Sequence, residues 1–316
     1  MPEQVPDHLL DDPEVPDPAK RLIMAVDFGT TYSAIAYVAF EEDESVGYLN
    51  PSRIRTIQNY PDDANFGSLD GEMRSEVPTE VIYPLDQSFR EKEGLSEEAA
   101  EEEELDDLGR FEEQGGSGNP LAVFGGGQYS QDPDQMSIDE DSSFRWGYGA
   151  HEAWGRSATH ADPKNRPLAR FKLLLDDSPR TEAVRNELNV TLDELKKKRI
   201  INDHRDVIAD FLTCLLRHAK SELLSAGFDD NYKLETVLCV PAIWSQKACR
   251  DMQTALAIAM GRAGLQGVDV LNNSIENLFI VSEPEAAAAY VLAESRNISV
   301  KHTSPSLLLV QRVLTN

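Results

Sequence analysis

The sequence has no run of about 18 apolar residues, which argues against a helix that spans a membrane. Its first residues are acidic and proline-rich, without the basic and apolar segments of a secretory signal peptide. Cysteine is scarce: Cys214, Cys239 and Cys249 are odd in number and lack the spacing of metal ligands. We therefore expect reduced, mostly buried thiols in a cytoplasmic protein.

Basic residues are also scarce. The chain of 316 residues has 30 Lys and Arg against 56 Asp and Glu, for a formal net charge of −26. Residues 91–113 alone hold twelve acidic residues against one Lys and one Arg, and residues 1–17 hold neither Lys nor Arg. This distribution argues against a nucleic-acid partner, which would need a basic face.

The length allows one large or two ordinary domains. Residues 1–20 are rich in Pro, Asp and Glu, and we expect a disordered acidic tail. Residues 86–142 are rich in Glu, Asp, Gly, Ser and Gln, which predicts a largely disordered insertion. Its glycine run 125–127 has no aspartate before it and no strand after it, so we interpret it as a flexible linker.

The most informative segment is a turn between two apolar strands. The first strand ends at Asp27, and Gly29, Thr30, Thr31 and Tyr32 follow it. A glycine lets the backbone come close to a ligand, while turn N–H groups and hydroxyls can donate to phosphate oxygens. The Asp27 carboxylate would repel an anion, so its natural partner is Mg²⁺ or the water bound to Mg²⁺. The alternative is an ordinary hairpin with a polar turn.

Further elements follow along the chain. Residues 77–83 predict a strand, and residues 203–226 carry the four-residue apolar spacing of a core helix. The strand 236–240 precedes a helix that Ser245 would cap. The strand 278–281 precedes another helix, and we expect it to be buried.

A strand, a helix and a second strand in this order predict a parallel pair with a right-handed crossover. Ligands of such sheets lie at the carboxyl ends of the strands. Pro241, Glu283 and Asp27 each follow or end a strand in this way. We therefore predict that the three residues line one crevice.

Four segments together resemble the heat shock protein 70 family of the actin-like ATPase superfamily. They are Val26–Ser33, Val237–Ala242, Gly261–Leu265 and Glu283–Tyr290, in that order. The resemblance implies an α/β fold, with residues 21–305 forming the first lobe of an actin-like (ribonuclease H-like) nucleotide-binding domain. That lobe would be a mixed sheet flanked by helices. Cys239, Trp244 and Glu285 look like a divergent branch of the family with atypical or absent peptide-binding parts.

The resemblance also implies ligands and residue roles. ATP or ADP and Mg²⁺ would be the cofactors, and co-chaperones or client proteins the macromolecular partners. Asp27 would hold Mg²⁺ through water, while Gly29, Thr30, Thr31 and Tyr32 would contact the phosphates. The catalytic candidates are Lys172 for neutralising the phosphoryl group, Glu283 for positioning water and Pro241 as a conformational switch.

Each catalytic candidate has a plainer alternative. Glu283 could simply be an acid favoured at a helix N-terminus. Pro241 could only end a strand, and Lys172 could be a surface lysine lying along a core segment. Arg170 could replace Lys172 as the phosphate-binding cation.

The family needs a second phosphate loop, Asp-x-Gly-Gly-Gly-Thr, after the strand that follows the Glu-Pro helix. Residues 306–310 match that strand, but neither aspartate nor glycine follows them. We expect residues 306–316 to be a truncated start of the second lobe, with nucleotide binding weakened and hydrolysis impaired further. Whether the chain is an enzyme stays open.

Two other functions are compatible with parts of the sequence. A non-catalytic interaction protein would keep the first-lobe fold and recruit partners through its acidic insertion. A sugar kinase of the same superfamily would share the Asp-x-Gly-Thr turn, but Tyr32-Ser33 and the helix at Glu283 favour the chaperone branch.

Overall fold

The computed structural model describes residues 20–41, 44, 51–63, 74–84, 88–95, 144–155, 167–269 and 274–294. Our expectations for the tail, for most of the acidic insertion and for residues 306–316 lie outside these ranges. Within the described part of the chain, no helix is both long and apolar enough to cross a membrane.

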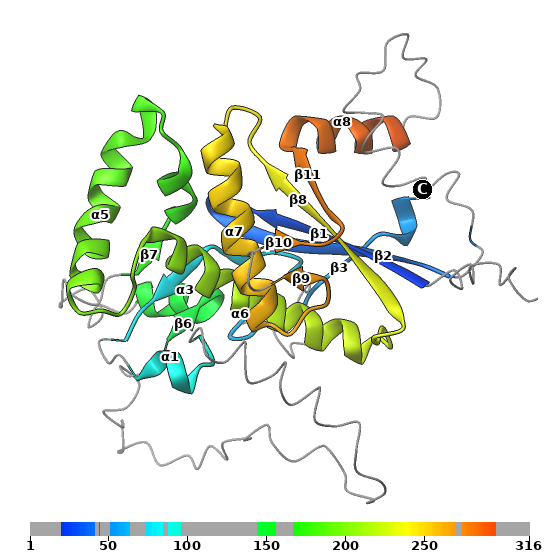
Figure 1. Ribbon diagram of the computed structural model, residues 1–316, viewed down its shortest axis with the longest axis horizontal. Coiled ribbons are helices and arrows are strands. Elements are labelled where there is room, and N and C mark those ends of the chain that lie inside the picture. Colours follow the sequence, from blue (N-terminus) through cyan, green and yellow to red (C-terminus); the bar gives the residue numbers. More distant parts are fainter. Residues whose placement is uncertain are drawn as a thin grey trace, which may run out of the picture.

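The centre of the fold is a mixed sheet, as the family resemblance implied (Figure 1). It has six strands. Five strands follow the order β11-β8-β1-β2-β3, and β4 pairs with β2 beside β3. β1 and β2 are antiparallel, whereas β8 is parallel to both β1 and β11. The predicted parallel pair is therefore confirmed. The strands of this sheet are β1 (Lys20–Phe28), β2 (Tyr32–Phe40), β3 (Arg55–Thr56), β4 (Val77–Pro78), β8 (Tyr232–Val240) and β11 (Leu278–Ser282).

Two smaller sheets lie outside it. One has the order β6-β5-β7, and the other pairs β9 with β10. Their strands are β5 (Glu80–Ile82), β6 (Arg145–Trp146), β7 (Leu168–Ala169), β9 (Val268–Asp269) and β10 (Ser274–Ile275).

The helices differ widely in length. The α-helices are α1 (Phe89–Lys92), α3 (Gly147–Gly155), α5 (Glu182–Lys197), α6 (His204–Ser225), α7 (Gln246–Arg262) and α8 (Glu283–Glu294). Short 3₁₀ helices are η1 (Pro51–Arg53), η4 (Phe171–Leu175) and η5 (Pro179–Thr181).

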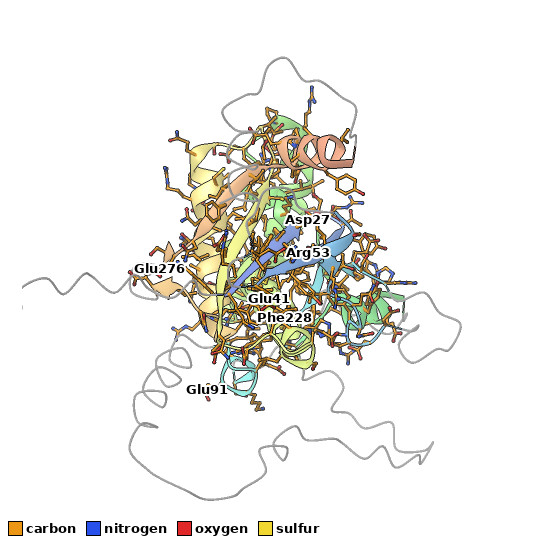
Figure 2. The ribbon with its side chains drawn as sticks, turned by 90° about the vertical axis from the view of Figure 1, so that its right-hand side faces the viewer. Asp27, Glu41, Arg53, Glu91, Phe228 and Glu276 are labelled. Atoms are coloured by element: carbon orange, nitrogen blue, oxygen red, sulfur yellow. The ribbon has the colours of Figure 1, made fainter. Side chains whose placement is uncertain are left out.

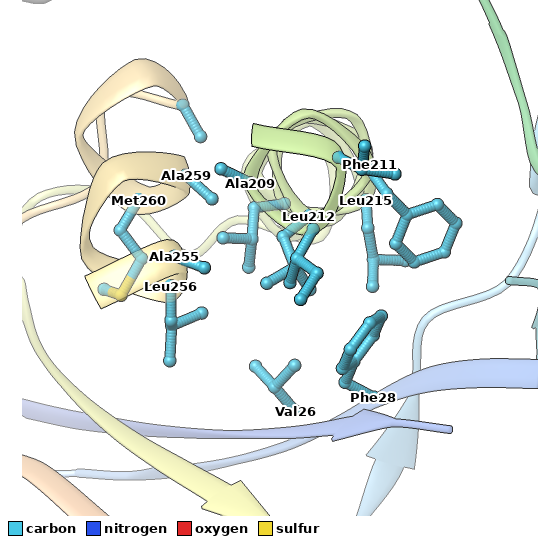
Figure 3. Close-up of a cluster of buried hydrophobic side chains, with 14 of the residues drawn as sticks. Val26, Phe28, Ala209, Phe211, Leu212, Leu215, Ala255, Leu256, Ala259 and Met260 are labelled. Atoms are coloured by element: carbon cyan, nitrogen blue, oxygen red, sulfur yellow. The ribbon is translucent and has the colours of Figure 1, made fainter. Parts of the chain in front are cut away.

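The main core lies between the sheet and the helices α6 and α7 (Figure 3). Side chains of both helices point toward Val26 and Phe28 of β1. Alternate β1 residues turn to opposite faces, as a strand requires. Ile23 accordingly belongs to a separate small cluster with Val38 and Phe40.

The two core helices begin at the residues that the sequence indicated. Asp203 caps α6 by accepting a 2.6 Å hydrogen bond from the Arg205 backbone N–H, and the Asp206 side chain completes a capping box. Ser245 caps α7, where its Oγ accepts a 3.2 Å hydrogen bond from the Ala248 backbone N–H. Each cap satisfies an N–H group that the first helical turn cannot pair.

A buried carboxylate connects α6 to its neighbours. Asp210 is fully buried and accepts hydrogen bonds from Arg90 at 2.8 Å, Arg262 at 3.0 Å and the Tyr83 hydroxyl at 2.7 Å. Burial raises the pKa of Asp210, although the two guanidinium groups oppose this shift. We call these four residues the Asp210 cluster. The cluster joins α1, α6 and α7.

Two predicted strands differ from the structure. The segment 77–83 is not one strand, because Thr79 separates β4 in the large sheet from β5 in a small one. The strand near residues 278–281 exists as β11, but only Val281 is buried and Ile280 is 36% exposed. β11 is the last strand in the order of the sheet, so it is less covered than β1 or β8.

Candidate functional site

The turn between β1 and β2 has the backbone geometry that the sequence predicted. Asp27 lies near the end of β1, where the chain enters the turn (Figure 2). A Cβ atom on Gly29 would collide with the backbone carbonyl oxygen of Tyr32. The chain can therefore turn this tightly only with glycine at this position.

Thr79 holds the second half of the turn through two hydrogen bonds on its buried side. The Thr79 N–H donates a 2.8 Å hydrogen bond to the Thr31 carbonyl oxygen, and the Thr79 hydroxyl lies 2.8 Å from the Ser33 hydroxyl. Both hydroxyls are buried, whereas Thr31 is exposed and the Tyr32 side chain is 41% exposed. The turn is thus anchored on its inner side and open on its outer side.

Lys172 lies near this end of β1 because the residue before it, Phe171, packs into the core. The Phe171 ring is fully buried and lies 5.9 Å from the Phe28 ring and 5.7 Å from the Phe211 ring, centroid to centroid. Phe28 follows Asp27 directly, just as Lys172 follows Phe171. The packing of the two phenylalanines therefore brings the adjacent charged residues into the same region.

Lys172 is paired with Glu283 across 111 sequence positions. Its Nζ donates a 2.8 Å hydrogen bond to Glu283 Oε1. The Lys172 side chain is only 5% exposed, whereas the Glu283 side chain is 46% exposed. Glu283 is the first residue of α8, and Ser282 before it pairs with Val240 of β8. The parallel register therefore sets Glu283 beside Pro241 at the carboxyl end of β8.

Asp27 completes a group of three charges, which we call the Asp27–Lys172–Glu283 group. Partial burial raises the pKa of Asp27; Lys172 lowers it, and the negative charge of Glu283 raises it. Cys239, near the end of β8, lies close enough to these three charges to be affected by them. Burial raises the pKa of its thiol to about 11, and the charges of Asp27 and Glu283 add to that shift. The thiol is therefore protonated at neutral pH.

Trp244 is a site residue to which the sequence reasoning gave no role. Its ring centroid lies 5.5 Å from Lys172 Nζ, within the range of a cation–π interaction. The Trp244 N–H donates a 3.1 Å hydrogen bond to the Pro241 carbonyl oxygen. The sequence shows only that an aromatic residue follows Pro241 by three positions. It gives no sign of the contact with Lys172, which depends on the tertiary structure.

The structure thus brings together the predicted Asp27, Lys172 and Glu283, with Pro241 in register beside Glu283. Gly29, Thr30, Thr31 and Tyr32 form the adjacent turn. Arg170, the alternative to Lys172, is exposed and has a left-handed backbone with φ of 61°.

A hollow of about 420 Å³ lies elsewhere, beside β3 and the end of α6. It contains none of the candidate site residues. Its lining includes Tyr37, Arg55, Asn59 and Glu222, and the Asn59 amide donates a 3.0 Å hydrogen bond to Glu222. This hollow is a separate surface feature.

Among the residues that the structure describes, no group of three or more His, Cys, Asp or Glu side chains could hold a metal ion. Asp27 and Glu283 are the acids of the candidate site. Mg²⁺ commonly binds through one or two carboxylates together with substrate phosphates and water. The donor set here therefore fits an ion that arrives with a phosphate ligand, and not an ion held by protein groups alone.

Comparison with known proteins gives little further information. No family model matches the chain, and neither does any curated protein. A solved structure of a non-polymerising mutant of MamK bound to AMPPNP is similar, with a TM-score of 0.31 and 14% sequence identity. The similarity covers 86% of this chain and 44% of that one, so the chain spans less than half the length of that protein. A likeness at this level does not assign a family.

Proposed function

We propose that the described residues form the first lobe of an actin-like nucleotide-binding domain of the heat shock protein 70 type, and that they bind the phosphates of Mg-ATP. The observation that carries the proposal is the buried Lys172, whose Nζ lies 2.8 Å from Glu283 Oε1 next to Asp27. One cation and two carboxylates from three distant segments meet at the carboxyl ends of parallel strands. Such strand ends are where open α/β sheets bind ligands.

The proposed roles follow from the charges and the geometry. Lys172 supplies a positive charge for a transferring phosphoryl group, because phosphoryl transfer depends mainly on charge stabilisation and positioning. Glu283 is half-exposed and carries an acceptor that can orient a water molecule. The outer side of the turn offers the hydroxyls of Thr30, Thr31 and Tyr32 to phosphate oxygens.

Mg²⁺ would supply charge neutralisation at the phosphates when bound. Asp27 would hold the waters of the ion, and its accessible carboxylate suits that role. Its raised pKa means that the protein groups around it compensate the charge of the Asp27 carboxylate poorly. A bound cation would compensate that charge. This is a physical reason for ion and nucleotide to bind together.

Pro241 is proposed as the conformational switch, on the strength of the sequence resemblance and of its register beside Glu283. Hydrolysis, a chaperone cycle and clients or co-chaperones rest on the resemblance alone. Because the segments described here supply one phosphate loop, we expect weak nucleotide binding and still weaker hydrolysis.

The test is calorimetric titration of the purified chain with Mg-ATP at millimolar concentration. We expect binding by the wild type and at least a tenfold loss in Asp27→Asn. Glu91→Gln is the matched control, because Glu91 is an exposed acid on α1. The absence of binding in a folded wild-type chain, or equal binding by Asp27→Asn, would refute the nucleotide proposal.

That refutation would favour the interaction-protein alternative. We would then expect a cooperative thermal melt, together with a binding partner that is lost when residues 96–118 are deleted, a deletion that keeps α1 and Arg90. ADP formation that depends on an added hexose, with the phosphoryl group recovered on the sugar, would instead point to a sugar kinase.

A further inference from the structure

The Lys172 ammonium is held from two directions. Glu283 Oε1 accepts its hydrogen bond at 2.8 Å, and the centroid of the Trp244 ring lies 5.5 Å from Nζ. The Lys172 side chain is 5% exposed, so little water competes with the ring for the ammonium. Cation–π attraction is stronger at such desolvated positions than at the surface.

The Trp244 ring is itself held in place. The backbone N–H of Trp244 donates a 3.1 Å hydrogen bond to the Pro241 carbonyl oxygen, and the next residue, Ser245, caps α7. The half-buried ring also packs against the main core. The end of β8 and the start of α7 therefore fix the position of the ring.

The two partners of Lys172, Glu283 and Trp244, differ in whether an incoming phosphate competes with them for the ammonium group. The Glu283 carboxylate is an anion, so a phosphate competes with it for the same ammonium protons. The Trp244 ring is neutral and attracts the cation through its quadrupole, so it does not compete in this way. A lysine stem is flexible, and an ammonium released by Glu283 would otherwise lose its position.

We propose that Trp244 is a positioning residue that keeps the Lys172 ammonium in place when a phosphate group displaces Glu283 from it. The inference rests on the proposed function, because it gives Lys172 a phosphate partner. Trp244 does not touch the phosphate in this scheme. Its effect passes entirely through Lys172.

The first experiment is a double-mutant cycle read out by Mg-ATP affinity. Trp244→Leu keeps an apolar side chain without a π face, and Trp244→Phe keeps the face. We expect Trp244→Leu to weaken Mg-ATP binding by roughly 5–30-fold in the wild-type background. Trp244→Phe should retain most of the wild-type affinity.

In a Lys172→Met background, Trp244→Leu should have no further effect on Mg-ATP affinity. Equal losses in both backgrounds would overturn the positioning role, because they would show that the ring only packs.

The second experiment needs no nucleotide. The fluorescence of Trp244 is isolated by subtracting the spectrum of Trp244→Phe, with Lys172 present and with Lys172→Met. We expect the emission maximum of Trp244 to shift when the ammonium is removed. An unchanged spectrum would overturn the inference even if the chain binds Mg-ATP. A shifted spectrum in a chain that does not bind Mg-ATP would instead refute the proposed function, and the positioning role with it, while the Lys172–Trp244 contact would stand.

Discussion

Lys172 and Glu283 form an ion pair whose two members differ greatly in exposure: the Lys172 side chain is 5% exposed and the Glu283 side chain 46%. The pair joins η4 to the first residue of α8. A buried charge that loses its partner costs more than an exposed charge that water can solvate. The stability of the chain should therefore respond unequally to the loss of each partner.

Glu283→Ala should lower the free energy of unfolding by about 1–3 kcal/mol, because it leaves the buried Lys172 without its carboxylate. Lys172→Met should cost less, because Glu283 can turn to solvent. Urea unfolding followed by circular dichroism measures both. The double variant Lys172→Met/Glu283→Ala should be no less stable than Glu283→Ala, and a lower stability of the double variant would contradict this account.

Asp27→Asn should make the ligand-free chain more stable at neutral pH. The folded-state pKa of Asp27 is raised, so the folded chain binds this proton more tightly than the unfolded chain. The resulting stability is fully present below the unfolded pKa of about 3.8 and is lost as the pH rises through the folded pKa. At pH 7 the carboxylate therefore costs stability that the neutral amide does not.

Thermal melts from pH 4 to pH 7 check this prediction. The advantage of Asp27→Asn should grow with pH, while the control Glu91→Gln should show no such trend. A variant less stable than wild type at pH 7 would show that protein groups alone compensate the charge of Asp27.

Gly29→Ala should destabilise the fold by about 1–3 kcal/mol, because the new Cβ would collide with the Tyr32 carbonyl oxygen and force the turn to shift. Gly227→Ala is the control: its Cβ would meet no atom within 4 Å, although its φ is 90°. That variant should cost only about 1–2 kcal/mol of backbone strain and leave Mg-ATP binding intact. Full Mg-ATP affinity in Gly29→Ala would refute the proposed turn.

Asp210→Asn should cost about 3–5 kcal/mol, because it leaves the buried Arg262 and the partly buried Arg90 without a negative charge. Chemical denaturation measures the loss. Glu41→Gln, which removes the exposed partner of Lys20, is the control and should change the denaturation midpoint little. If the two variants behave alike, the Asp210 cluster does not stabilise the fold.

The sequence could predict features that depend on neighbouring residues. The start of α6 at residue 203 and the cap Ser245 could be predicted because a helix and the residues that begin it are adjacent in sequence. The parallel pairing of β8 and β11 followed from the strand–helix–strand order. That pairing in turn placed Pro241 and Glu283 at one edge of the sheet.

Other features depend on contacts between distant segments and had no local signal. The break at Thr79 arises because its N–H pairs with Thr31, 48 positions earlier, so the chain leaves one sheet for another. The Asp210 cluster and the Lys172–Trp244 contact also join residues far apart in sequence. Lys172 itself has no local signal in the sequence, and only the family resemblance indicated a role for it.

The order of strands in the large sheet has a consequence during synthesis on the ribosome. β1 pairs with β2 through a turn of three residues, but its other neighbour, β8, begins at Tyr232. The β1–β2 hairpin can therefore form early. The other edge of β1 stays unpaired until β8 has been translated, which requires more than half of the chain. At about 5–20 residues per second, this takes roughly ten seconds or more. An apolar strand edge exposed for that long is a natural target for a chaperone that binds nascent chains.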